Sequence, residues 1–267
     1  MGLLLVGLQG PVSAELAPIA IIIDDIGNNL HAGKRVIHSA LPYTCSILPA
    51  RPYSIKLAKL AHRHGKEVML HLPMQASKST RLGYGALTTE MSKQEFTRTV
   101  DISIDAIPHV SGVNNHMGSL LTSELDYMQW LMQTIANRDK PLFFIDSKTT
   151  TRTVAATVAH SYHIPSLQRD VFLDDTANDE KFVRQQVQRL RKIAKQKGYA
   201  LAIGHPHKTT LSVLEQEFKN ANVKGVRLVS VSELIEIAKT QELAKESNLI
   251  GQKYAADDGW YGYLDTR

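Results

Sequence analysis

The chain has 267 residues, of which 43% are hydrophobic and 21% charged, so it is long enough to bury the core of one large domain. Its formal net charge of +5 comes from scattered lysines and arginines, and only 6% of its residues are aromatic. Proteins that bind nucleic acid usually gather basic residues on one face with aromatics among them, so we expect no nucleic-acid partner. The single cysteine, Cys45, excludes an intrachain disulfide and a cysteine-based zinc site, and we expect it to be buried.

The first 14 residues predict an export signal. Residues 3–8 form a short apolar core, and the small residues 12–14 suit cleavage after Ala14. The basic start typical of such signals is missing, so ordinary apolar N-terminal sequence is the alternative. No run of about 18 apolar residues occurs, because polar residues interrupt this segment and the next, and we expect no membrane span. A periplasmic or secreted protein is the expectation that follows.

From residue 19 onward, short apolar strands alternate with longer helical stretches. Residues 19–23 form a continuous β-branched run, as in a parallel strand that is buried on both faces. The expected strands are residues 19–23, 43–48, 67–71, 110–113 (a weak signal), 142–145, 167–173, 200–203 and 226–231. The expected helices are residues 29–39, 53–64, 92–107, 123–137, 149–161, 179–197, 210–220 and 232–239. Seven or eight such units predict parallel pairing in a distorted (β/α) barrel, with a doubly wound open sheet as the alternative.

Several helix ends carry recognisable signals. Asn28 and Ser123 are expected to cap the first and fourth helices, and Gly65 to end the second. Ser92 and Glu95 have the spacing of a capping box.

Two segments stand outside the alternation of strands and helices. Residues 75–89 form a long polar stretch without clear periodicity, and loops of this length are usually functional or mobile. Residues 240–267 are polar, and we expect a tail that is loosely held or used in contacts.

Several of the strands end in side chains that bind metals or transfer protons. These side chains are Asp24, Asp25, His71, His116, His205 and His207. Open α/β sheets and (β/α) barrels keep their active sites at the carboxyl ends of their strands. The pattern therefore predicts an enzyme, although each of these residues also has an ordinary structural explanation, such as a helix cap or a core histidine.

Six motifs in order carry a resemblance to a known family: IIIDDIG, HLPMQ, GVNNHMGS, FFIDSKT, RDVFLDD and AIGHPH. With them the chain resembles the divergent polysaccharide deacetylase family of bacterial envelope proteins, which belongs to a wider superfamily of (β/α)-barrel glycoside hydrolases and deacetylases. The resemblance covers residues 18–239 and implies a NodB-like deacetylase barrel over that range. It also implies a metal-dependent hydrolase that removes N-acetyl groups from a polysaccharide such as peptidoglycan.

The resemblance implies a role for each strand-end residue. Asp24 would be the general base, Asp25 and His71 metal ligands, and His205 the acid that protonates the leaving amine. Carboxylate and imidazole ligands favour zinc, although cobalt or nickel would also be accepted. The family's second metal-binding position after His71 holds Gln75, which is a poor ligand, and the family's arginine-proline motif is absent.

Other residues would complete or support this site. His116, which also ends an expected strand, is the candidate for the third metal ligand. Either Asp174 or Asp146 would hold His205 in the right tautomer, and Arg169 would orient Asp24. His207 would share the task of His205 or cap the following helix.

Two other functions stay open. The departure at Gln75 favours a catalytically inactive glycan-binding or regulatory protein on the same barrel. A glycosidase would need two carboxylates facing a sugar cleft, and Asp24 with Asp174 is the pair to consider. The sequence indicates neither the glycan nor the oligomeric state.

Overall fold

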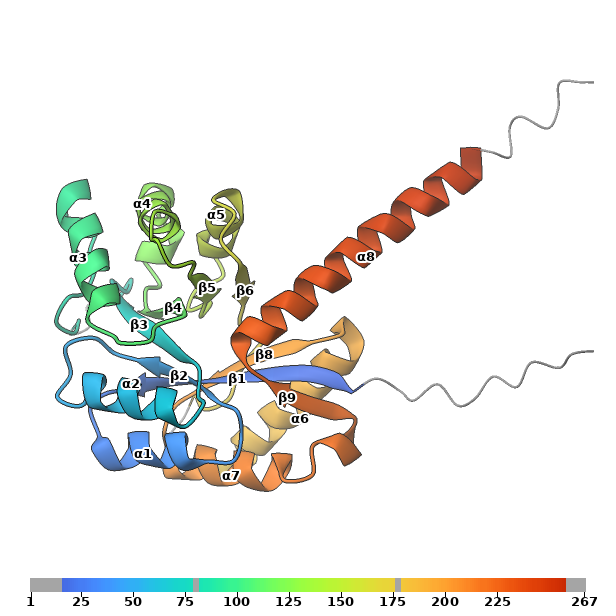
Figure 1. Cartoon of the computed structure of the whole chain (residues 1–267), viewed down its shortest axis with the longest axis horizontal. Helices are drawn as coiled ribbons and strands as arrows, with labels where there is room; N and C mark the ends of the chain where they lie inside the picture. The colour runs from blue at the N-terminus through green and yellow to red at the C-terminus, as the bar shows by residue number, and fades with distance from the viewer. Residues whose placement is uncertain (1–15, 79–81, 176–178, 258–267) are drawn as a thin grey trace, which may run out of the picture.

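A curled parallel sheet surrounded by helices makes up the body of the computed structural model, which describes residues 16–78, 82–175 and 179–257 (Figure 1). The strands are β1 (Ala17–Ile26), β2 (Thr44–Ile47), β3 (Val68–Met74), β4 (Gly112–Met117), β5 (Phe143–Asp146), β6 (Ser166–Gln168), β7 (Val171–Phe172), β8 (Ala200–Gly204) and β9 (Val226–Val229). The helices are α1 (Leu30–His38), α2 (Ser54–Arg63), α3 (Lys93–Asp105), α4 (Leu125–Ala136), α5 (Ala155–Ser161), α6 (Glu180–Lys197), α7 (Lys208–Phe218) and α8 (Val231–Asp257), with short 3-10 turns η1 (Leu121–Ser123) and η2 (Asn222–Lys224).

The strands follow one another around the sheet in the order β6-β5-β4-β3-β2-β1-β8-β7, and β9 pairs with the start of β1. All of these pairs are parallel. The two ends of the order, β6 and β7, are consecutive in the chain, so the sheet curls into a distorted barrel that is joined where the backbone passes through Arg169 and Asp170. The predicted (β/α) barrel is confirmed, and the doubly wound sheet is excluded because the strands run in chain order from β1 to β6.

Side chains alternate along the strands between the helices outside and the interior of the barrel. In β1 the outward set is Ile19, Ile21 and Ile23, which join the larger buried core beneath the helices. Ala20 and Ile22 belong instead to a smaller core inside the barrel, which the first turns of α8 help to close. The continuous apolar run of β1 is therefore explained by burial on both faces.

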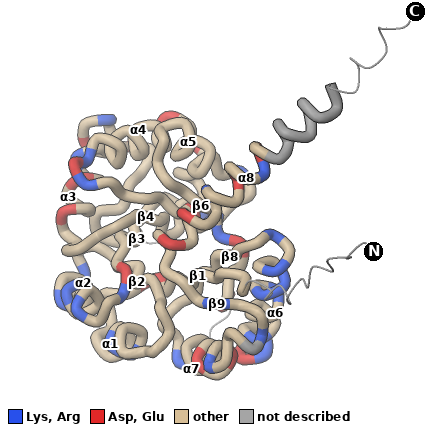
Figure 2. Tube along the Cα trace, turned by 45° about the vertical axis from the view of Figure 1, so that its right-hand side comes forward, with Lys and Arg blue, Asp and Glu red and all other residues tan. Residues whose placement is uncertain are grey.

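Many of the charged side chains lie on the outer helices. Figure 2 shows Lys and Arg over α2, α3 and α6, with Asp and Glu among them, as the scattered positions in the sequence predict. Among the described residues, no helix is both long and apolar enough to cross a membrane. The expected export signal at residues 1–14 lies outside the described residues.

Four strands differ clearly from their predicted extent. β1 runs from Ala17 to Ile26, so Asp24 and Asp25 lie within the strand rather than after its end. β3 continues to Met74, so His71 lies within the strand rather than at its end. β4 begins later than predicted and includes His116. The strand expected over residues 167–173 is divided into β6 and β7, because its first half pairs with β5 and its second half with β8.

The helix boundaries also differ in places. Asn29, not Asn28, caps α1, since its side chain accepts hydrogen bonds from the backbone N–H groups of His31 and Ala32. Ser123 belongs to η1 and does not cap α4. The capping box of Ser92 and Glu95 is confirmed.

Two further helices have different lengths from those predicted. The fifth begins at Ala155 instead of residue 149, because the intervening residues form a loop. The last does not end at residue 239 but continues to Asp257 and leaves the barrel surface (Figure 1).

Candidate active site

The candidate site lies at the carboxyl ends of the barrel strands, where the interior changes from apolar to polar. The interior positions Ile22, Met69, Ile145 and Ile203 are each followed two residues later by a polar side chain, namely Asp24, His71, Ser147 and His205. Side chains two apart share one face of a strand, so these polar groups meet above the apolar interior.

Asp25 reaches the same place through an irregularity in β1. The pairing of β1 with β2 shifts in register between Ile23 and Ile26. Asp25 itself has a φ of +58°, in the left-handed region that Asp and Asn enter more readily than most residues. A bulge of this kind re-aims a side chain, which brings Asp24 and Asp25 to one site although regular alternation would separate them.

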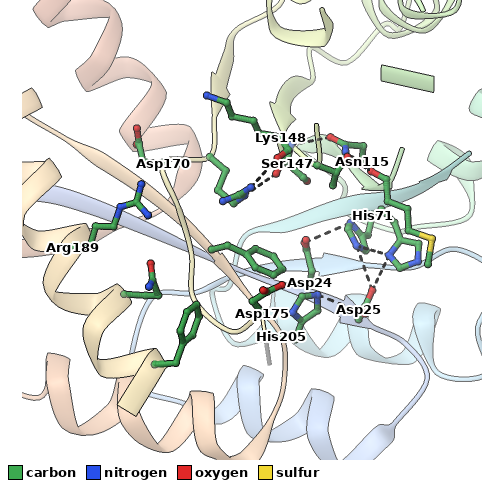
Figure 3. Close-up of a pocket in the computed structure, with 17 residues that line it drawn as sticks. Asp24, Asp25, His71, Asn115, Ser147, Lys148, Asp170, Asp175, Arg189 and His205 are labelled. Carbon is green, nitrogen blue, oxygen red and sulfur yellow. Dashed lines mark hydrogen bonds and ion pairs between the residues drawn. The ribbon is translucent and has the colours of Figure 1, made fainter. Parts of the chain in front are cut away.

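Three potential metal ligands converge on one point (Figure 3). Asp25 Oδ1 lies 3.0 Å from His116 Nδ1 and 3.4 Å from His71 Nε2. The two ring nitrogens are 3.0 Å apart. The side chain of His71 is only 2% exposed, whereas those of His116 and Asp25 are 19% and 35% exposed, so one side of the cluster faces solvent.

Asn114 connects Asp24 and His71. Its amide nitrogen donates to Asp24 Oδ1 at 2.9 Å, and its carbonyl oxygen accepts from Ser46 Oγ at 2.9 Å. The same carbonyl oxygen lies 2.8 Å from His71 Nδ1. Because a carbonyl only accepts, His71 Nδ1 carries a proton, and in the neutral ring Nε2 offers its lone pair toward Asp25 and His116.

The surrounding charges shift the pKa values of the cluster. Burial alone would raise the pKa of Asp25, but the imidazoles of His116 and His71 hold it well below its ordinary range. Burial opposes protonation of His71, yet the carboxylates of Asp24 and Asp25 raise its pKa above the ordinary value. The cluster therefore favours a charged carboxylate beside imidazole rings.

His205 is held by Asp174 and not by Asp146. Asp174 Oδ1 lies 2.9 Å from His205 Nδ1, and its Oδ2 accepts from the backbone N–H of His205 at 2.8 Å and from Thr210 Oγ1 at 2.7 Å. His205 Nε2 is directed to the cluster, 3.8 Å from Asp25 Oδ2. Burial lowers the pKa of His205, but the hydrogen bond and charge of Asp174 outweigh it and raise the pKa to about 9.

Asp146 and Arg169 have contacts other than those predicted. The fully buried Asp146 accepts from the backbone N–H of Lys148 at 2.8 Å and from Thr153 Oγ1 at 2.9 Å, so it orders the loop after β5. Arg169 donates to the backbone carbonyls of Ser147 at 2.7 Å and Lys148 at 2.8 Å, and it makes no direct contact with Asp24. Arg169 lines the cavity described below, whereas Asp146 acts through the loop that it orders.

His207 and Gln75 lie apart from the three candidate metal ligands, Asp25, His71 and His116. His207 occupies the N-cap position of α7, but its side chain makes no capping hydrogen bond, and its ring centroid lies 5.7 Å from that of His205. Gln75 Oε1 accepts from Thr89 N at 2.7 Å and from Thr89 Oγ1 at 3.0 Å. Gln75 thus connects the start of the loop that follows β3 to its end at Thr89.

A cavity of about 780 Å³ opens over the cluster (Figure 3). Besides the residues above, its lining includes Lys148, Phe172, Phe182 and Arg189, none of which the sequence interpretation selected. The sequence interpretation did not select Asn114 either, because asparagine is also common in turns and helix caps. Its spacing of two from His116 in one strand was the signal that would have placed both side chains on one face.

Comparison with known proteins matches residues 21–235 to the family described as divergent polysaccharide deacetylase. The uncharacterized protein YibQ of Escherichia coli (strain K12) is 36% identical over 231 residues, which cover 86% of this chain and 70% of YibQ. An uncharacterized protein of Haemophilus influenzae (strain ATCC 51907 / DSM 11121 / KW20 / Rd) is 32% identical, over 81% of this chain and 76% of that protein.

The solved structure of the uncharacterized protein ATU2773 from Agrobacterium tumefaciens C58 has the same fold, with a TM-score of 0.78 at 21% identity. The match covers 83% of this chain and 90% of that chain. The fold is the distorted parallel (β/α) barrel that was predicted, and the resemblance inferred from the six motifs is confirmed. The chain belongs to the divergent polysaccharide deacetylase family.

Proposed function

We propose that this protein is a metal-dependent deacetylase that hydrolyses N-acetyl groups of an envelope glycan. The observation that carries the proposal is the convergence of Asp25, His71 and His116 beside the carboxylate of Asp24 and the imidazole of His205. Metal ligands, a base and an acid are the parts that amide hydrolysis at neutral pH requires.

The three-residue cluster fits a divalent metal. Ligands about 2.0–2.2 Å from a tetrahedral zinc lie about 3.3–3.6 Å from one another, which is close to the observed separations of 3.0 to 3.4 Å. Asp25 Oδ1 is buried and has no hydrogen bond of good geometry, although two imidazole nitrogens lie within this range. Three protein ligands leave a fourth position open, as in catalytic zinc sites, and we propose zinc on that ground.

The metal would act as a Lewis acid and lower the pKa of a water molecule. Asp24 would take a proton from that water while the oxygen atom of the water adds to the acetamide carbonyl carbon. His205, whose pKa of about 9 keeps it protonated at neutral pH, would donate the proton from Nε2 to the leaving nitrogen. The C–N bond then breaks, and acetate and a free amine on the sugar are released.

The expected export signal at residues 1–14 supports a periplasmic or secreted site of action, where envelope glycans are accessible. The family description supports a polysaccharide as substrate. Phe172 and Phe182 line the cavity and offer apolar faces for a sugar ring.

The contacts of Gln75 and Asp174 bear on the two alternatives. The absence of a ligand at Gln75 favoured an inactive protein, but His116 on the neighbouring strand supplies a third donor to the cluster. The glycosidase alternative needs Asp174 as a free acid or nucleophile, whereas both of its oxygens are engaged by His205 and Thr210.

The test compares metal content and acetate release for the parent chain, Asp24→Asn, His116→Ala and Asp139→Asn. Asp139 is exposed after α4 and serves as a control for the same chemical change away from the site. We expect about one metal per chain in all except His116→Ala, and acetate release from an N-acetylated glycan only in the parent chain and Asp139→Asn. Unchanged acetate release by Asp24→Asn would refute the assignment.

A further inference from the structure

Three cationic side chains line the cavity on the side away from the metal cluster. They are Lys148, Arg169 and Arg189, which come from the loop after β5, the passage from β6 to β7, and α6. Figure 3 shows Lys148 and Arg189 on one side of the pocket, with Asp25, His71 and His205 on the other. The pocket therefore has a second charged wall that the hydrolysis described above does not use.

Arg169 is fixed in place at this wall. Its Nε and Nη2 donate to the backbone carbonyls of Ser147 and Lys148, and its guanidinium lies 5.0 Å from the centre of the Phe172 ring. Nη1 has no such partner among these contacts and keeps its donor capacity. An arginine anchored by two backbone carbonyls is preorganised, so little entropy is lost when it binds an anion.

Lys148 is held at the rim by its backbone. Its N–H donates to Asp146 Oδ1, its carbonyl accepts from Arg169, and its φ is +51°. Within the described ranges its amino group has no hydrogen bond or ion pair.

Arg189 differs from the other arginines of its helix. Arg184 and Arg191 of α6 both pair with Glu217, whereas Arg189 has no carboxylate partner in the part of the chain that the structure describes. Burial lowers the pKa of Arg169 and the like charge of Arg189 lowers it further, whereas the charges of Asp146, Asp24 and Asp170 raise it. The guanidinium groups of Arg169 and Arg189 therefore lie close enough in one cavity to act on each other.

The carboxylates of Asp146 and Asp170, which act on Arg169, are also engaged by other donors. Asp170 lines the cavity but is paired with Lys197 Nζ at 3.0 Å and accepts from the backbone N–H of Leu201. Asp175 is exposed and lies beside Asp24 and His205 in Figure 3. An oxyanion bound between the three cations would satisfy donors that the protein itself leaves open.

We propose that this wall is a subsite for an anionic group of the glycan, so that the substrate is an N-acetylated polysaccharide that also carries a carboxylate or phosphate within about one sugar of the reacting acetamide. This inference takes the reaction from the proposed function, whereas the anion site itself is argued from the cavity lining alone. A cavity of about 780 Å³ has room for more than one sugar ring, which lets one ring reach the cluster while the anion meets the cations.

The test measures the binding of three tetrasaccharides by calorimetry. The first is neutral and contains only N-acetylglucosamine; the second alternates N-acetylglucosamine with carboxylate-bearing N-acetylmuramic acid; the third is the neutral one phosphorylated at a 6-hydroxyl. Each is titrated into the parent chain, Lys148→Gln, Arg189→Gln and Arg98→Gln. Arg98 is exposed on α3 outside the cavity lining. Arg98→Gln therefore makes the same change in charge and shape as Arg189→Gln, but away from the cavity.

We expect at least one anionic glycan to bind the parent chain about tenfold or more tightly than the neutral one, with a preference that weakens at high salt. Lys148→Gln and Arg189→Gln should each remove most of that preference and leave binding of the neutral glycan within about twofold. Arg98→Gln should retain the preference. The anionic glycan that binds more tightly shows whether the subsite prefers a carboxylate or a phosphate.

Equal binding of neutral and anionic glycans by the parent chain would overturn the proposal, as would a preference that survives in both cavity variants. Binding of none of the three glycans would also overturn it. Acetate release is measured in parallel: charge-dependent binding without acetate release contradicts the deacetylase function alone, and acetate release without a charge preference contradicts the anion subsite alone.

Discussion

Asn114→Ala removes the side chain that links Asp24 to His71. The substitution takes away the hydrogen bonds that the amide nitrogen donates to Asp24 Oδ1 and, at 3.3 Å, to Ser147 Oγ, and the two that the amide carbonyl accepts from His71 Nδ1 and Ser46 Oγ. A bond to a charged group contributes about 1.5–3 kcal/mol and a neutral one about 1 kcal/mol, so we expect the free energy of unfolding to fall by roughly 3–5 kcal/mol. Loss of the partner that orients a metal-binding histidine should also weaken metal affinity roughly 10–100-fold.

Two measurements separate these effects. Urea unfolding gives the change in the free energy of unfolding, and titration with zinc against a competing chelator gives the metal affinity of the folded protein. Val113→Ala is the matched control, because Val113 is the preceding residue of β4, is fully buried and faces the outer core. We expect it to cost about 2–3 kcal/mol of stability and to leave metal affinity unchanged. Zinc binding by Asn114→Ala as tight as that of the parent chain would refute the role assigned to Asn114.

Two other substitutions test the electrostatics. Asp174→Asn should lower the pKa of His205 from about 9 toward 6.5, and an NMR titration that finds it unchanged would contradict this pairing. Glu217 has its pKa lowered from 4.5 to about 2, because hydrogen bonds from Arg191 and Lys224 outweigh burial. The folded-state value is depressed, so this stabilisation is present above about pH 4.5 and is lost as the pH falls toward 2. Glu217→Gln should therefore reduce stability by about 1–3 kcal/mol at pH 7 and by less at pH 3.5, as measured by urea unfolding; an equal loss at both pH values would rule the ion pairs out as its cause.

The strands of the barrel were predictable because a buried parallel strand leaves a chemical signature. Residues 19–23 are all apolar and are followed at once by Asp24 and Asp25, so both the buried part of β1 and the polar residues near its carboxyl end are visible in the sequence. The division of the strand expected over residues 167–173 into β6 and β7 was not predictable, because an apolar run does not reveal which neighbouring strand each half pairs with. The extent of α8 was missed for a related reason: a helix can continue where its apolar pattern fades, once its first turns are packed.

The site residues were predictable where the residue type has few structural roles, and they were not predictable where it has many. Asp25, His71 and His116 were predicted together as metal ligands, and the bulge in β1 and the pairing of β3 with β4 explain how they meet. Asn114 forms turns, caps and buried networks with equal ease, so its role depended on neighbours that are distant in sequence. The assignment of His205 to Asp174 rather than Asp146 likewise required the position of β7 beside β8.

The join between β6 and β7 divides the barrel into parts that should open at different rates. β6 pairs through three residue positions and β7 through two, whereas β1 forms ladders with β2, β8 and β9. Local unfolding begins where backbone hydrogen bonds are few, so amide hydrogens should exchange early at this join and late in β1. Asp24 and Asp25 then lie on the most persistent strand, whereas Arg169 lies at the join. The part of the pocket wall that Arg169 lines can therefore move while the two carboxylates keep their positions.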